Sequence, residues 1–92
     1  MANNASARKR VRQHERNRLR NRTARSRLRT EVKGFRAAIA ANDQEKAGLL
    51  LKSACALLDK TAQKGIIHRN AAARTKSRLA HAHAQMVAAA SS

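Results

Sequence analysis

Apolar residues recur at three- and four-residue steps in three stretches of this chain, which is the spacing of one face of a helix. The middle stretch carries the longest series: Ala47, Leu50, Leu51, Ala54, Leu57, Leu58, Thr61 and Ala62. The stretches on either side carry Leu28, Val32, Phe35 and Ile39, and then Ala71, Ala72, Thr75, Leu79, Ala82 and Met86. The chain has no Pro and no alternating strand pattern. The pattern therefore predicts helices at about 6–41, 43–64 and 68–88.

Two short breaks separate the predicted helices. Asn42 precedes Glu45 by three residues, the spacing of a capping box, and is expected to cap the second helix. Gly65 follows the second stretch and is expected to adopt the left-handed conformation that ends a helix. Three apolar faces joined by short loops predict an all-α fold, a three-helix antiparallel bundle whose long N-terminal helix projects beyond the bundle.

The first helix changes character near its middle. Before Leu28, the apolar residues Val11 and Leu19 share no continuous stripe, so this half cannot dock on another helix by hydrophobic burial. Ninety-two residues allow one domain at most. We therefore interpret residues 1–92 as a single helical domain, with a basic arm at 1–27 and the three-helix bundle at 28–88.

The arm is strongly cationic. Thirteen Lys and Arg residues occupy the first 36 positions, against only Glu15 and Glu31, and eleven of the thirteen are Arg. Charge of this density repels itself unless a polyanion is bound, and the planar donor fork of Arg suits phosphate oxygens. Nucleic acid is the expected partner. Because the single aromatic residue, Phe35, provides no stacking platform, we expect recognition of phosphates and shape.

The cations of the first helix fall on two opposite lines when residues are placed at 100° per step. One line holds Lys9, Arg16, Arg20 and Arg27, and the other holds Arg18, Arg22, Arg25, Arg29 and Arg36. One duplex would engage only one line. We therefore expect the helix to lie between two nucleic-acid segments and to clamp them, the alternative being that one line only supplies solubility. The third helix adds Arg69, Arg74, Lys76 and Arg78, with His68 and Asn70 at its start.

The sequence gives little support to other function classes. The five acidic residues are scattered and no glycine-rich phosphate loop is present, so no enzyme, small-molecule substrate or cofactor is expected. His81 and His83 are two positions apart on a helix and should not chelate a metal together. No apolar run is long enough for a membrane span. A leucine-zipper factor is disfavoured by the break at Asn42, which leaves a histone-like compacting protein as the alternative.

Three groups of residues resemble a known family. They are Ala2-Asn3-Asn4-Ala5-Ser6-Ala7-Arg8-Lys9-Arg10; the run from Glu15 through Asn17, Asn21, Ser26 and Leu28 to Arg29-Thr30; and Gly65-Ile66-Ile67-His68-Arg69-Asn70 with Ala72-Ala73-Arg74, Lys76 and Ser77-Arg78-Leu79. In these residues the chain is similar to the bacterial small-subunit ribosomal proteins numbered twenty, over about positions 2–80. The third group is the most specific of the three.

The resemblance implies a non-enzymatic constituent of the small ribosomal subunit that binds 16S ribosomal RNA and helps assemble and bridge its 5′ domain and 3′ minor domain. It implies a cytoplasmic protein, a monomer within a bacterial ribosome that has other small-subunit components as neighbours. By matching position, the expected RNA-binding residues are Lys9, Arg10, Arg16, Asn17, Arg20, Asn21, Ser26, Arg29, Arg69, Asn70, Arg74, Lys76, Ser77 and Arg78. The charge pattern adds Arg12, Arg18, Arg22, Arg25, Arg27 and His68.

Overall fold

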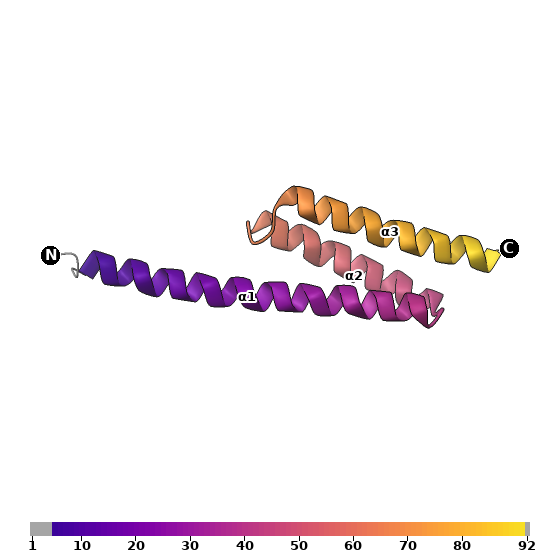
Figure 1. The fold of residues 1–92 in the computed structure, drawn as a ribbon, viewed down its shortest axis with the longest axis horizontal. Helices are drawn as coiled ribbons and strands as arrows, with labels where there is room; N and C mark the ends of the chain where they lie inside the picture. The colour runs from indigo at the N-terminus through magenta and orange to yellow at the C-terminus, as the bar shows by residue number, and fades with distance from the viewer. Residues whose placement is uncertain (1–4, 92) are drawn as a thin grey trace.

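The computed structural model describes residues 5–91, which form three helices and no strand. Helix α1 spans Ala5–Ala40, α2 spans Gln44–Gln63 and α3 spans Arg69–Ser91. Successive helices run in opposite directions along one long axis (Figure 1). The predicted all-α antiparallel bundle is confirmed, and each helix lies within a few residues of its predicted bounds. Residues 2–4, part of the first group that resembles the family, lie outside the described residues.

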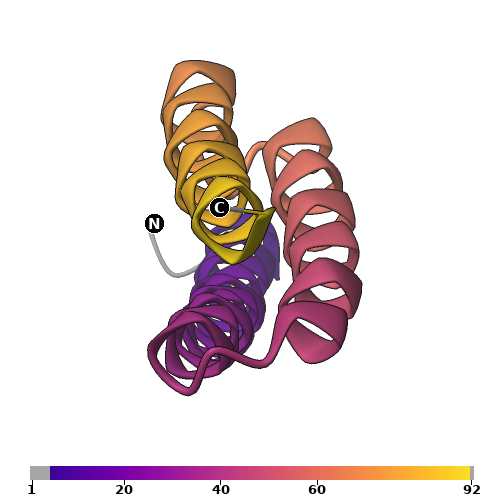
Figure 2. The same ribbon diagram turned by 90° about the vertical axis from the view of Figure 1, so that its right-hand side faces the viewer.

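The bundle is held by α2, which packs against α1 on one side and α3 on the other, while α1 and α3 hardly touch. Viewed end on, the three helices lie at the corners of a triangle (Figure 2). The core consists of Phe35, Ala38, Ala47, Ala54, Leu58, Ala72, Leu79 and Met86. Half of these side chains are Ala, which lets the backbones approach closely but buries little apolar area.

Helix α1 extends well beyond the other two. Its 36 residues are about 54 Å long at 1.5 Å per residue. The molecule as a whole measures 71 × 21 × 14 Å. Residues 8–20 are all exposed, and Val11 and Leu19 remain 62% and 66% accessible. Packing begins near Asn21 and Ala24, which are half-buried. The projecting helix is thus confirmed, whereas an arm that ends at residue 27 stays a prediction.

The first turn differs from the prediction for Asn42. Asn42 has φ 58°, so it is the left-handed residue that ends α1, and it does not cap α2. Its amide donates to the carbonyl of Ile39, and the amide of Asp43 donates to Ala38, as in a Schellman motif. The cap of α2 is Asp43, whose carboxylate accepts a hydrogen bond from the amide of Lys46 at 3.1 Å. The expected capping box with Glu45 is therefore wrong.

The second turn confirms the role expected of Gly65. Gly65 has φ 77°, and its amide donates to Ala62 while that of Ile66 donates to Thr61, again a Schellman motif. Ile66 is 5% exposed, which anchors the turn against the bundle. The turn thus sets where α3 begins.

Two glycine substitutions should change stability in opposite directions. Gly65→Ala should destabilise the bundle by about 1–2 kcal/mol, because a Cβ meets no atom there and the cost is backbone strain alone. Gly34→Ala should stabilise it by about 0.5–1 kcal/mol, because this helical glycine leaves room for a methyl group 3.9 Å from Leu50. Thermal unfolding followed by circular dichroism measures both. Equal shifts of the same sign would contradict the assigned backbone conformations.

Candidate nucleic-acid interface

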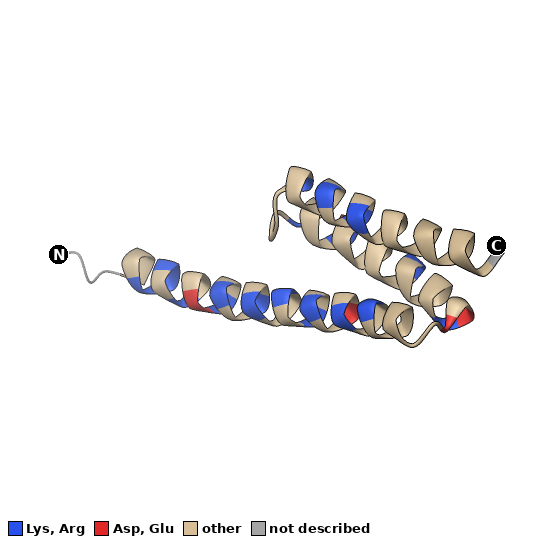
Figure 3. Ribbon diagram, turned by 45° about the vertical axis from the view of Figure 1, so that its right-hand side comes forward, with Lys and Arg blue, Asp and Glu red and all other residues tan. Residues whose placement is uncertain are grey.

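The bundle covers one side of α1 and leaves both lines of cations uncovered. The buried and half-buried residues Leu28, Val32, Phe35 and Ile39 lie between the two lines on the helix circumference. Lys and Arg follow α1 over most of its length and continue on the first half of α3 (Figure 3). The two lines therefore flank the bundle on opposite sides, which the sequence alone could not establish.

The first basic face combines one line of α1 with the end of α2. Arg16, Arg20 and Arg27 line a groove together with Lys60 and Lys64, and no acidic residue lines it. We define the first basic face as Lys9, Arg16, Arg20, Arg27, Lys60 and Lys64. Neither Lys60 nor Lys64 is among the RNA-binding residues that the sequence analysis predicted. The sequence feature that could have identified them is their four-residue spacing, which puts both on one side of the helix directly before the Gly65 turn. No acidic residue lies one helical turn from Lys64.

The second basic face combines the other line of α1 with α3. Arg25, Arg29 and Arg36 line a groove between the two helices, and Lys33 joins them. Ala71 and Thr75 are the α3 residues of the same groove. Arg74 lies three positions after Ala71 and Arg78 three positions after Thr75, so both share that side of α3. We define the second basic face as Arg18, Arg22, Arg25, Arg29, Lys33, Arg36, Arg74 and Arg78.

Two predicted RNA-binding residues of α1 also contact the bundle or are partly covered by it. Arg25 donates from Nη2 to the backbone carbonyl of Ile66 at 3.0 Å, which ties α1 to the turn before α3. A guanidinium has five N–H donors, so donors remain for a phosphate. Asn21 is half-buried, and its Oδ1 is buried without a hydrogen-bond partner. An unpaired buried acceptor costs stability, so Asn21 is a poor choice for the bundle alone.

The start of α3 gathers polar groups around its first turn. His68 caps the helix, because its Nδ1 accepts a hydrogen bond from the amide of Asn70 at 3.0 Å. The proton of a neutral imidazole is then on Nε2, which is left as a donor. The first turn has no acidic residue and instead carries Arg69. A cation at the positive end of a helix dipole is unfavourable unless an anion is nearby, which is consistent with a phosphate site.

The remaining predicted residues are mostly exposed. On α1 these are Lys9, Arg10, Arg12, Arg16, Asn17, Arg18, Arg20, Arg22, Ser26, Arg27 and Arg29, and in the α3 region His68, Arg69, Asn70, Arg74, Ser77 and Arg78. Lys76 differs, because its Nζ lies 2.9 Å from Oδ1 of Asp59 and bridges α3 to α2. Its charge is thus already partnered within the bundle. The structure thus brings most of the predicted residues to the surface.

Comparison with known proteins shows which family this chain belongs to. The family model described as ribosomal protein S20 matches residues 2–84. The chain belongs to this family. Small ribosomal subunit protein bS20 of Acidithiobacillus ferrooxidans is 58% identical over 79 residues, which cover 86% of this chain and 87% of that protein. The protein of the same name from Mycolicibacterium vanbaalenii is 55% identical over 82 residues, 89% of this chain and 95% of that protein.

Membership of the ribosomal protein S20 family confirms the resemblance read from the sequence. Members of this family are structural constituents of the ribosome and not enzymes. Within residues 5–91 no cluster of three or more His, Cys, Asp or Glu could hold a metal ion. In the same range, no helix is both long and apolar enough to span a bilayer.

The Lys76–Asp59 pair should give a defined pH dependence. The hydrogen bond from Lys76 to Asp59, together with the attraction of that carboxylate, raises the pKa of Lys76. Because this pKa is raised, the pair stabilises the fold from neutral pH up to the ordinary lysine pKa of 10.5, and the contribution is lost as the pH rises through the folded-state value. Asp59→Asn should therefore lower the melting temperature slightly at pH 7. A difference between the two proteins that persisted undiminished well above pH 10.5 would contradict this assignment.

Proposed function

We propose that this chain is a structural constituent of the small ribosomal subunit of a bacterium, where it binds 16S ribosomal RNA through phosphate contacts. Its family and the names of its relatives support the ribosomal role. The exposed Arg residues of α1 and α3 support the phosphate contacts, because a guanidinium pairs with phosphate oxygens by two parallel hydrogen bonds. Other small-subunit components are its expected neighbours, and it acts as a monomer.

We propose further that the protein bridges two RNA elements, the 5′ domain and the 3′ minor domain, and so aids assembly. The observation that carries this proposal is the position of the two basic faces on opposite sides of the bundle, each with its own groove. One helix carries both faces, the first over residues 9–27 and the second over residues 18–36. RNA bound on one side leaves the other side free for a second segment, and neutralising both faces relieves the repulsion within α1.

Substitutions that neutralise each face separately test the bridge. One variant carries Arg16→Gln, Arg20→Gln and Arg27→Gln, and the other carries Arg18→Gln, Arg22→Gln and Arg29→Gln. Each should still bind one RNA fragment but fail to retain a labelled 3′ minor domain fragment on an immobilised 5′ domain fragment. Loss of three phosphate contacts should also reduce the slope of log affinity against log salt by about 3.

The matched control for the lysines of the first basic face uses the same helix. Lys60→Gln with Lys64→Gln should weaken the bridge, whereas Lys46→Gln with Lys52→Gln, which removes the same charge outside both grooves, should not. If either face of α1 can be neutralised without effect on the ternary complex, the bridge is wrong. Equal affinity for 16S fragments and for generic duplex DNA near physiological salt would instead favour the histone-like compacting function.

A further inference from the structure

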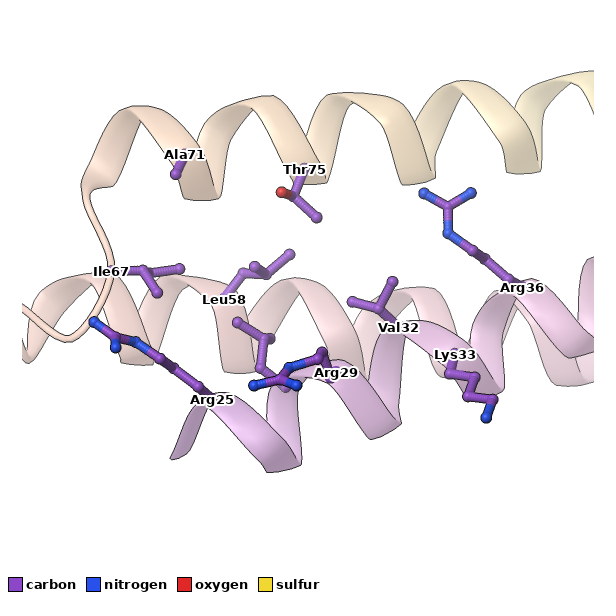
Figure 4. Close-up of a pocket in the computed structure, with 10 residues that line it drawn as sticks. Arg25, Arg29, Val32, Lys33, Arg36, Leu58, Ile67, Ala71 and Thr75 are labelled. Atoms are coloured by element: carbon purple, nitrogen blue, oxygen red, sulfur yellow. The ribbon is translucent and has the colours of Figure 1, made fainter. Parts of the chain in front are cut away.

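The groove between α1 and α3 has an apolar lining that phosphate binding leaves unexplained. It has a volume of about 560 Å³, within the range of about 300–1,000 Å³ that small ligands occupy. Leu28, Val32, Leu58 and Ile67 supply its apolar lining, and Ala71 and Thr75 close it on the α3 side. Figure 4 shows these side chains between the two helices. Phosphates alone would leave this apolar surface in contact with water.

The rim of the groove is cationic. Arg25, Arg29, Lys33 and Arg36 line it from α1, and no acidic residue lines it. In Figure 4 the guanidinium of Arg36 extends from α1 toward α3. Arg74 and Arg78 are exposed on the same side of α3 as Ala71 and Thr75 and add positive charge to this side of the molecule. A bound polyanion would offset the repulsion among these cations.

The apolar floor suits the base of a nucleotide, and the cationic rim suits its phosphate. We propose that the groove between α1 and α3 receives an unstacked base of the RNA bound along the second basic face, with its flanking phosphates on the rim. The base lies on the aliphatic floor and against the planar guanidiniums, which stack on bases where aromatic side chains are lacking. Phe35 cannot stack on the base, because its side chain is fully buried.

This proposal rests on RNA binding by the second basic face and names what that face recognises. A helix of a partner protein could also cover an apolar groove, but it would need acidic residues on both flanks to match the rim. RNA supplies negative charge on both sides of every base. A nucleotide is therefore the occupant that the charge of the rim favours.

The test fills the groove without altering the rim. Ala71→Leu introduces a larger side chain at an exposed position of the groove, and Ala73→Leu is the matched control two residues away, outside both grooves. Chemical probing of unpaired bases in 16S fragments should find at least one base protected by the wild type and by Ala73→Leu but not by Ala71→Leu. The affinity of Ala71→Leu should fall by roughly tenfold, since one base stack is lost.

The outcomes separate this inference from the proposed function. If all three proteins bind 16S fragments with equal affinity and protect the same bases, the groove holds no nucleotide, and RNA binding by the basic faces still stands. If the wild type binds no 16S fragment, both proposals fail. Circular dichroism checks that each variant folds. Should Ala71→Leu unfold, the pair Ala71→Glu and Ala73→Glu applies, and equal affinities in that pair overturn the proposal.

Discussion

Repulsion among the guanidiniums of α1 is the constraint on which the rest of the structure depends. Over residues 8–20 these side chains are all exposed on one helix, where they repel one another. Glu15 is the only acid in that segment. In the proposed function, phosphates on both sides of the helix would relieve this repulsion. The shape of the protein then follows, because any element that packed over the arm would block one of its two faces.

The bundle serves to hold that helix in place. Its core is small and rich in Ala, but it needs only to fix the angle of α1 and the start of α3. Arg25 makes the link direct, since its hydrogen bond to Ile66 joins the arm to the turn that begins α3. The buried, unpaired oxygen of Asn21 lies in the same stretch of α1. This unpaired oxygen lowers the stability of the free protein where the arm leaves the bundle. The same stretch carries residues that are expected to bind RNA.

The sequence predicted the helices well, because the apolar stripes and Gly65 carry strong local signals. It failed at the first turn, where Asn42 and Asp43 can each end or begin a helix, and only the positive φ of Asn42 distinguishes the two roles. The two opposite lines of Arg followed from helical period alone. Their grooves did not, because the inclusion of Lys60 and Lys64 depends on how α2 crosses α1. The gap between α1 and α3 likewise reflects tertiary packing, which no periodicity predicts.

The dependence of the arm on phosphate is tested most directly by amide hydrogen exchange over residues 8–20, with and without 16S RNA. In the free protein at low salt, we expect exchange close to that of an unstructured chain, because charge repulsion opposes the helix and no residue of this segment is buried. Bound to RNA, the same amides should become strongly protected. Strong protection of these amides in the free protein would contradict the claim that phosphate binding holds the arm.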